Sequence, residues 1–278
     1  MKSLDSPHTQ PILPLPGKRE CVPPVAIGSR LGRSKIVTTL GFKPNFCDYT
    51  DREMDLIRRA PTIYWPTAFY AGLFSAMGKK TFPSVDNYAF ALDKIKQTAM
   101  FKLLGIPHPR TRLFYGKNQK RTITDFFSFP FIAKIPRGSS KGKGVFLINT
   151  PRDLDTYLKI PGPAYIQEYL PCDRDMRVIV IGRQIVLAFW RRAKDNEFRT
   201  NISQGGTIDF SDLSCQAMEL ALETARLCNW DDVGLDIMEY QGKPMVIEAN
   251  MKYGTKGFKV AGIDYTQILE CLIVTGKI

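Results

Sequence analysis

Three side chains that carry oxygen atoms, Asp236, Glu248 and Asn250, lie close together near the end of the chain. They fall on or beside two short runs of strand-forming residues, and the Gln-Gly-Lys break at 241–243 predicts a β-hairpin between these runs. Side chains alternate faces along a strand, so Glu248 and Asn250 are expected on one face. A three-residue loop at 241–243 would place Asp236 opposite Glu248 on that same face. The two runs are Val233–Tyr240 and Pro244–Ala249.

These three side chains have the chemistry of a site for a hard metal ion. Two carboxylates that face each other across a hairpin repel unless a cation or a proton lies between them. Oxygen ligands without His or Cys suit Mg²⁺ or Mn²⁺, which keeps waters or phosphate oxygens in its remaining positions. We therefore predict that Asp236, Glu248 and Asn250 bind Mg²⁺ (or Mn²⁺). The alternative is a surface hairpin whose acidic side chains face water.

A second stretch combines a lysine in an apolar strand with a glycine-rich loop. Lys134 follows Phe-Ile-Ala, and a lone ammonium group in such a strand is costly unless it pairs with an anion. The loop can bind phosphate, because glycines let backbone N–H groups converge on phosphate oxygens, although the Walker A spacing is absent. A flexible loop with solvated lysines is the alternative. The loop residues concerned are Gly138, Ser139, Ser140, Gly142 and Gly144.

Two further segments have side chains suited to a nucleotide. Four cations fall within residues 191–199, and the last of them is Arg199. Such a cluster suits triphosphate recognition and the neutralisation of charge in a transition state, but a solvated basic turn or a nucleic-acid patch is an equal alternative. Upstream, residues 167–170 end a strand, where Glu168 and exposed backbone can receive an adenine and its ribose.

The composition restricts the chemistry further. The 278 residues include only two histidines, so mechanisms based on Ser-His or Cys-His pairs have almost no candidates. Six scattered cysteines without a CxxC pair favour free thiols in a reducing cytoplasm. No apolar run approaches the length of about 18 residues that a membrane helix needs, so no membrane partner is expected. The net charge of +12 implies acidic partners: nucleotide phosphates, nucleic acid or an acidic polypeptide.

The order of the expected elements indicates an α+β fold in three parts. Residues 1–35 are rich in proline and basic side chains and predict an extended or disordered tail. Residues 36–86 predict a small α/β domain, and residues 87–278 predict strand pairs with separate blocks of helix. One expected helix starts at Thr50. The other expected helices cover 67–77, 86–104, 214–227 and 265–274. The expected strands outside the hairpin are 36–40, 131–135, 145–148, 165–169, 176–181 and 184–190.

Taken in order, these motifs resemble the ATP-grasp superfamily and, within it, the RimK-like α-L-glutamate ligases. The resemblance spans roughly residues 88–260, and it is specific because nine short motifs occur in order at compatible spacing. The motifs are Asp93-Lys94, Lys134 with the 138–144 loop, Gln167-Glu168-Tyr169, Asp175-Met176-Arg177, Arg191-Arg192-Ala193-Lys194, Phe198-Arg199-Thr200-Asn201, Gly205-Gly206, Gly234-Leu235-Asp236 and Glu248-Ala249-Asn250.

The resemblance implies an ATP-grasp fold, in which two α+β subdomains clasp ATP, here preceded by the small α/β domain. It implies that Arg199 faces the transferred phosphoryl group and that Asp236, Glu248 and Asn250 bind the metal ions. The residues implied for the nucleotide are Lys94, Lys134, the 138–144 loop, Glu168, Leu170 and Asp175.

The reaction implied is amide formation. A substrate carboxylate attacks the γ-phosphate of ATP, and an amine then displaces phosphate from the acyl-phosphate. This chemistry depends on positioning and charge neutralisation, which suits a site of Lys, Arg and metal. Glutamate or another amino acid would be added to a peptide or protein. A homo-oligomeric enzyme is also compatible with the sequence. The alternatives are a non-catalytic nucleotide-binding module and a basic nucleic-acid- or ribosome-associated protein.

One segment departs from the family pattern. After the Glu-x-Asn motif, RimK-like ligases usually continue with a small residue and then Ser-Pro-Gly. This chain has Met251-Lys252-Tyr253-Gly254 instead. The loop expected to face the acceptor substrate therefore has different chemistry in this protein.

Overall fold

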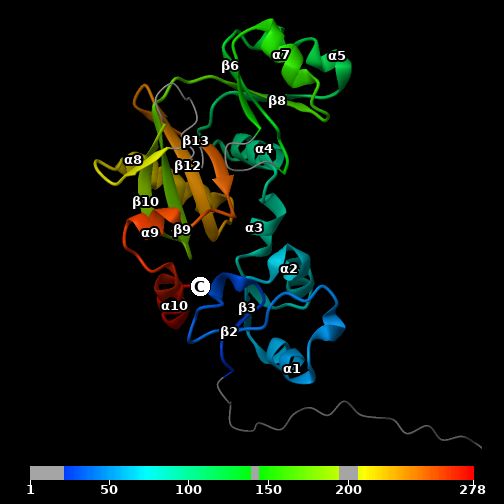
Figure 1. The fold of residues 1–278 in the computed structure, drawn as a ribbon, viewed down its shortest axis with the longest axis vertical. Coiled ribbons are helices and arrows are strands. Elements are labelled where there is room, and N and C mark those ends of the chain that lie inside the picture. Colours follow the sequence, from blue (N-terminus) through cyan, green and yellow to red (C-terminus); the bar gives the residue numbers. More distant parts are fainter. Residues whose placement is uncertain (1–21, 139–143, 194–205) are drawn as a thin grey trace, which may run out of the picture.

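Three β-sheets organise the chain in the computed structural model, which describes residues 22–138, 144–193 and 206–278. Figure 1 shows a small parallel sheet at the bottom and two antiparallel sheets above it, with helices packed against them. The orders are β2-β1-β3-β4 in the parallel sheet, β5-β8-β6-β7 in the upper sheet and β11-β10-β9-β12-β13 in the central sheet. This arrangement confirms the predicted α+β class. Within the described residues, no helix has both the length and the apolar character to cross a membrane.

The parallel sheet begins earlier in the chain than the sequence predicts. Its strand β1 pairs with β2 on one side and β3 on the other, and Val25, Ala26 and Ile27 are fully buried. The tail predicted over 1–35 is therefore wrong in its last part. A strand buried on both faces needs only a short apolar run, and the prolines before it concealed this one. The elements are β1 (Val25–Ala26), β2 (Thr38–Thr39), β3 (Thr62–Tyr64), β4 (Lys80–Phe82), α1 (Asp51–Arg59) and α2 (Thr67–Ala76).

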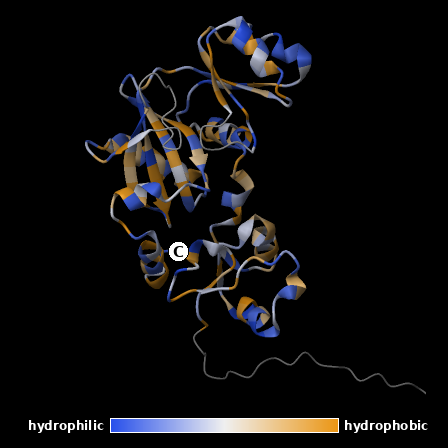
Figure 2. Ribbon diagram, in the orientation of Figure 1, coloured by the Kyte–Doolittle hydropathy of each residue, from blue (hydrophilic) through white to orange (hydrophobic). Residues whose placement is uncertain are grey.

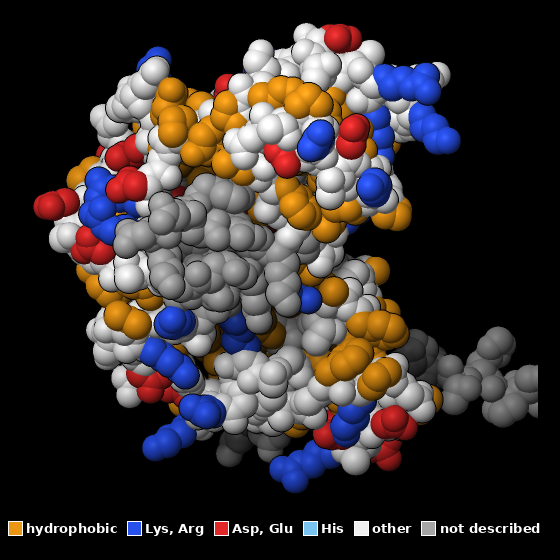
Figure 3. Space-filling model, turned by 45° about the horizontal axis from the view of Figure 1, so that its top comes forward, with side chains coloured by type: hydrophobic (Ala, Val, Ile, Leu, Met, Phe, Trp, Pro, Cys, Tyr) orange, Lys and Arg blue, Asp and Glu red, His pale blue; other side chains and the backbone are white. Residues whose placement is uncertain are grey.

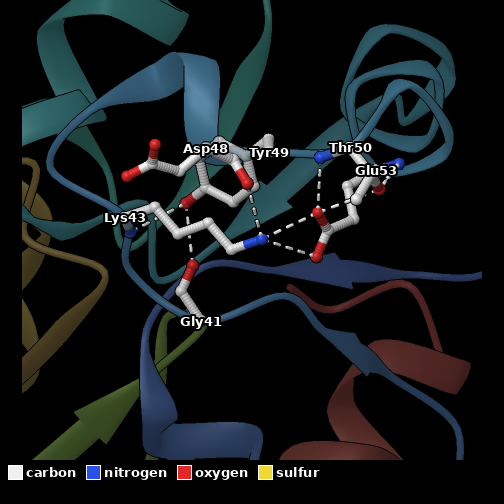
Figure 4. A network of polar contacts seen from close by, with 6 residues as sticks. All are labelled: Gly41, Lys43, Asp48, Tyr49, Thr50 and Glu53. Atoms are coloured by element: carbon white, nitrogen blue, oxygen red, sulfur yellow. Dashed lines mark hydrogen bonds and ion pairs between the residues drawn. The ribbon is translucent and has the colours of Figure 1, made fainter.

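Helix α1 starts at the capping box that the sequence predicts. Thr50 Oγ1 accepts a hydrogen bond from the Glu53 N–H, and the Glu53 carboxylate accepts one from the Thr50 N–H. Figure 4 shows that Lys43 extends this contact, because its Nζ lies 3.0 and 2.8 Å from the two Glu53 oxygens and 3.2 Å from the Asp48 carbonyl oxygen. The loop before α1 is thereby fixed against the start of the helix.

Both faces of the central sheet are buried, each in its own core. On β9, Met176, Val178 and Val180 pack with α4 and α8, whereas Ile179 and Ile181 pack with α10 and the N-terminal sheet. Figure 2 shows these central strands as largely hydrophobic. The N-terminal sheet therefore shares a core with the central sheet. The elements are β9 (Arg174–Ile181), β10 (Gln184–Arg192), β11 (Thr207–Asp209), β12 (Asp232–Tyr240), β13 (Lys243–Asn250), α8 (Cys215–Leu227), α9 (Lys256–Val260) and α10 (Tyr265–Val274).

The face that carries Ile179 changes character along its length. Strand alternation and register place Asp175 and Arg177 of β9, Arg191 of β10 and Asp236 of β12 on this same face. One end of the face is apolar and covered by the N-terminal sheet and α10. The other end is charged, and it faces the upper sheet. The elements of the upper part are β5 (Thr111–Phe114), β6 (Phe131–Lys134), β7 (Val145–Ile148), β8 (Ala164–Glu168), α5 (Gly116–Lys120), α6 (Ile123–Phe126) and α7 (Pro151–Leu158).

The continuous helix predicted over 86–104 is wrong. The chain turns at Leu92, which has φ of 59°, and Asp93 caps the start of the next helix. A hydrogen bond of 3.0 Å from the Lys94 N–H to the Pro136 carbonyl oxygen holds this break. Apolar periodicity continues across the turn, so periodicity alone could not reveal it. The break puts Lys94 in the first turn of the second helix. The two helices are α3 (Val85–Phe90) and α4 (Lys94–Leu104).

The β12–β13 hairpin pairs Asp236 with Glu248 as predicted, but not through a three-residue loop. The turn consists of Gln241 and Gly242, which have φ of 51° and 72°, and Ile247 is an extra residue in β13. A β-bulge shifts the register by one residue. The two-residue turn and the bulge together therefore give the same pairing that a three-residue loop would give.

We expect Gly242→Ala to lower the free energy of unfolding by about 1 kcal/mol, because alanine is strained at this positive φ. The added Cβ would meet no atom within 4 Å, so the cost comes from the backbone alone. Gly72→Ala is the matched control, since Gly72 lies inside α2 with equally open space around an added Cβ. It should raise stability by up to about 1 kcal/mol. Urea unfolding measures both changes, and effects of the same sign would contradict the backbone explanation.

Candidate active site

A cleft of about 800 Å³, part of it open to solvent, lies between the upper and central sheets. Its apolar walls come from both sheets, with Ile132 on β6 and Met238 and Ile247 on the hairpin. The charged side chains that line it are Lys134, Glu168, Arg174, Asp175, Arg191, Asp236 and Glu248. The cleft thus combines apolar walls on two sides with a group of buried charges.

Three side chains hold the buried carboxylate of Asp236. Arg177 pairs with both of its oxygens, with Nη2 at 2.9 Å from Oδ2. Arg191 Nη2 lies 3.0 Å from Oδ2, and the Asn250 amide donates to Oδ2 over 3.1 Å. Burial alone would raise the pKa of this carboxyl, but Arg177 and Arg191 lower it below its ordinary value. Asp236 is therefore ionised at neutral pH.

Two further ion pairs complete the group. Arg191 Nε donates to Asp175 Oδ1 over 2.6 Å, and Lys94 Nζ lies 3.2 Å from Glu248 Oε1. Gln97 aligns this second pair, because its side-chain amide makes hydrogen bonds of 2.9 and 3.1 Å with the backbone of the residue after Glu248. Lys94 and Gln97 are three residues apart and share a helix face. The N-terminal turn of α4 is therefore fixed on the edge of β13.

Lys134 lies on the upper wall of the cleft and is 4% exposed. Its strand pairs with β7 and β8, and its carbonyl oxygen accepts a hydrogen bond of 2.7 Å from the Tyr157 hydroxyl. Burial lowers the pKa of Lys134 to about 8, although nearby carboxylates such as Glu248 act in the opposite direction. A buried ammonium group gains most from a multiply charged anion. The geometry and charge of Lys134 therefore suit a phosphate ligand.

The end of strand β8 forms the other side of the cleft. Glu168 and Leu170 both line it, as do the residues around them. One oxygen of Glu168 accepts a hydrogen bond from the Arg110 N–H, and the other lies 4.0 Å from Arg110 Nε. One oxygen of the Glu168 carboxylate therefore holds the start of β5, the neighbouring strand, against the end of β8.

The structure brings most of the predicted site residues together. Lys94 and Asn250 join the group through ion pairs or hydrogen bonds to residues of the cleft. Gly138 and Gly144, with φ of 68° and 79°, flank the segment 139–143. Those that line the cleft are Lys134, Glu168, Leu170, Asp175, Asp236 and Glu248. Those outside the described residues are Ser139, Ser140, Gly142 and Arg199. Ligand roles for all of these residues remain predictions.

Sequence reasoning missed the apolar walls and one partner of Asp236. Ile247 and Glu248 both line the cleft, which strict strand alternation forbids and the bulge permits. Nothing in the sequence marked that bulge. Arg177 lies two residues from Asp175 on one strand, and strand alternation therefore puts both side chains on the same face. That spacing could have identified Arg177 as a residue of the site.

The oxygen-bearing side chains are of the type that suits a hard divalent cation, and in this structure the Asp236 carboxylate is held by Arg177, Arg191 and Asn250. Asp236 and Glu248 present carboxylates from paired positions, and Asn250 adds an amide. Among the described residues, no group of three or more His, Cys, Asp or Glu gathers around one point. An ion held here therefore needs further oxygen ligands, which waters or phosphates supply.

Two α+β layers that enclose a cleft of buried charges define an ATP-grasp protein. A family model described as the RimK-like ATP-grasp domain matches residues 91–272, more than half of the chain, and the chain belongs to this family. A ribosomal protein bS6–L-glutamate ligase of Escherichia fergusonii is 27% identical over 235 residues, which cover 82% of this chain and 77% of that protein.

Two solved structures have a similar fold. The ATP-grasp ligase PsnB, complexed with a minimal precursor, has a TM-score of 0.67 at 18% identity, covering 90% of this chain and 97% of PsnB. The D-alanine–D-alanine ligase from Bacillus anthracis has a TM-score of 0.65 at 15% identity, covering 90% and 95%. The chain is an ATP-dependent ligase that forms carbon–nitrogen bonds, and ligases of this fold use ATP and a divalent metal ion.

We expect Lys134→Ala to weaken ADP binding by roughly ten- to a hundredfold, because a charge-assisted hydrogen bond to phosphate is worth about 1.5–3 kcal/mol. Lys102→Ala is the control, since Lys102 is exposed near the C-terminal end of α4, whereas the N-terminal end of that helix carries Lys94. It should bind ADP like the parent. Isothermal titration calorimetry measures both affinities, and circular dichroism confirms that each variant is folded. Equal affinities for the parent and a folded Lys134→Ala variant would remove this lysine from the nucleotide site.

Proposed function

We propose that the chain uses ATP and Mg²⁺ to activate a substrate carboxylate as an acyl-phosphate and to join it to the amine of an amino acid or peptide. The observation that carries this proposal is the convergence of Lys134, Arg191, Asp236 and Glu248 on one cleft with apolar walls. Cations at one place bind phosphates, and carboxylates beside them bind the metal that accompanies those phosphates.

The distribution of apolar and charged side chains orients the nucleotide, with its adenine at the apolar walls and its phosphates at the charged group. An adenine packs between Ile132 on the upper wall and Met238 and Ile247 on the lower wall. The end of β8, with Glu168 and Leu170, then receives the edge of the base and the ribose. The phosphates extend to the charged group, where the predicted ligands are Lys94, Lys134, Asp175 and the loop 138–144.

The reaction runs in two displacements. A carboxylate oxygen of the first substrate attacks the γ-phosphorus and ADP leaves. The amine nitrogen then attacks the acyl carbon, phosphate leaves with the bonding electrons, and the amine loses its proton. A bound Mg²⁺ supplies charge neutralisation on the phosphates. Lys134 and Lys94 orient the phosphates, and the family resemblance assigns to Arg199 the neutralisation of charge on the transferred phosphoryl group.

The relatives suggest the substrate class. The Escherichia fergusonii relative is named for adding L-glutamate to ribosomal protein bS6, and PsnB was solved with a precursor. We propose that one substrate of this chain is likewise an amino acid or a peptide. We also propose that the protein acts in the cytoplasm. Among the described residues on the face drawn in Figure 3, basic side chains lie among acidic ones, which does not favour the nucleic-acid alternative.

We expect Asp236→Asn and Glu248→Gln each to reduce metal-dependent ATP turnover by about a hundredfold or more, because each replaces a carboxylate ligand of the metal with an amide. Amide variants are preferable to alanine at Asp236, since alanine would leave Arg177 and Arg191 buried beside a gap. Glu239→Gln is the control, because Glu239 lies further along β12, beside the turn. ADP release at a series of Mg²⁺ concentrations measures the effect. Parent-like turnover in either cleft variant would refute its metal role.

An ADP-release screen tests the function as a whole. Amino acids and acidic peptides are supplied singly and in pairs with MgATP, and mass spectrometry identifies the product. ADP release that depends on both a carboxylate and an amine, with a product mass equal to their sum minus water, supports the ligase. Nucleotide hydrolysis that no pair stimulates would contradict the proposed substrate class.

A further inference from the structure

A second cleft lies where the N-terminal sheet meets the central sheet. It has about 910 Å³ of space, part of it open to solvent. Its walls come from the loop after β1, the end of β3, helix α3 and the turn after β13. Among the described residues that line it, Arg30 and Lys252 are cations and none is an acid. The side chains that line this junction cavity therefore carry a net positive charge, while the buried carboxylate of Asp232 lies within electrostatic reach of Arg30.

Arg30 is held in one position within the junction cavity. Its guanidinium carbon lies 4.8 Å from the ring centre of Tyr253 and 5.0 Å from that of Tyr265, and its Nε donates to the Tyr265 hydroxyl over 2.9 Å. Its Nη2 is buried and has no hydrogen-bond partner among the described residues. A buried donor without a partner is costly. Arg30 thus places a fixed cation in the wall of the cavity, with hydrogen-bonding capacity that the described residues leave unused.

Tyr253 connects this arginine to the loop in which the sequence departs from its family. The Tyr253 hydroxyl donates to the buried carboxylate of Asp232. Gly234 makes room for the ring, because a Cβ at that position would lie 3.0 Å from the Tyr253 Cβ. Lys252, beside it, lines the cavity. Both residues that replace the usual Ser-Pro pair therefore contribute to the cavity, Lys252 by its charge and Tyr253 by positioning Arg30.

The wall opposite the loop is built from strained backbone. Trp65 and Thr67, which both line the junction cavity, have φ of 42° and 67°. Such values are costly for residues other than glycine, above all for a β-branched residue, and they persist only where the surroundings enforce them. Strain of this kind concentrates at ligand sites.

The junction cavity is close to the active site along the chain, because the turn after β13 lines the cavity and β13 itself carries Glu248. Lys252 follows Glu248 by four residues, so their backbones are at most about 14 Å apart. On β12, Asp232 precedes Asp236 by four residues and belongs to the same sheet face. A small substrate whose reacting group lies beside Glu248 can therefore extend its other end toward Lys252.

We propose that the junction cavity binds a substrate carboxylate that the reaction does not consume, held between Arg30 and Lys252. This makes the enzyme selective for a substrate with an anionic group away from its reacting group. The proposal rests on the ligase function proposed above. That carboxylate belongs either to a dicarboxylic acyl donor or to the α-carboxylate of an amino-acid acceptor, and the chemistry of recognition is the same for both.

Calorimetry with four probes tests the proposal on the full chain, loaded with a non-hydrolysable ATP analogue and Mg²⁺. The probes are glutarate, L-alanine and their neutral counterparts glutaramide and L-alaninamide. At least one carboxylate probe should bind while its neutral counterpart does not. Binding of glutarate alone assigns the site to the donor, and binding of L-alanine assigns it to the acceptor. Equal binding of a neutral counterpart, or no binding of any probe at millimolar concentration, overturns the proposal.

Variants then place the bound probe in the junction cavity. Arg30→Gln should weaken its binding roughly ten- to a hundredfold, Arg30→Lys should restore part of the loss, and Lys252→Gln should weaken it without threatening the fold, because Lys252 is exposed. Arg33→Gln is the matched control, since Arg33 is exposed in the same loop.

Nucleotide affinity separates this proposal from the function on which it rests. The ATP analogue should bind all four variants as tightly as the parent. Probe binding that survives in both Arg30→Gln and Lys252→Gln would overturn the carboxylate site and leave the ligase intact. Failure of the parent to bind the analogue would instead contradict the proposed nucleotide site.

Discussion

The buried pairing of Asp236 with Arg177 and Arg191 is the constraint on which the site depends. Charges taken out of water are costly, and their mutual attraction offsets that cost only when the geometry is good and the remaining hydrogen bonds are made. Here two arginines and the Asn250 amide satisfy the carboxylate together, and Asp175 pairs with the second of these arginines, Arg191. Loss of one partner from such a group typically costs about 3–5 kcal/mol. The strands must therefore keep the register that brings these side chains to one face.

This requirement explains the irregular parts of the fold. The bulge at Ile247 sets Glu248 opposite Asp236, and the break before Lys94 turns a helix terminus toward β13. Gln97 then fixes that helix on the strand edge, so that a cation lies beside each carboxylate. Each irregularity interrupts a regular element at the point where a charged side chain has to be positioned.

The same sheet face also connects the candidate active site to the N-terminal sheet. Its apolar half is buried against that sheet and α10, and its charged half lines the cleft. Arg30 comes from the N-terminal part, whereas Tyr253 and Lys252 come from the turn after the hairpin. Side chains from two distant parts of the chain therefore meet at the junction.

The sequence by itself determined several of the longer elements, the hairpin, the family and most of the charged residues of the cleft, because these depend on local patterns and short motifs. Capping at Thr50 and the final helix followed directly from residue spacing. Only the tertiary structure decided where the helix broke, which residue bulged and that the first strand begins before residue 35. These features arise from contacts between distant segments, such as Lys94 with Pro136 and Arg30 with Tyr253, and local sequence contains no record of such contacts.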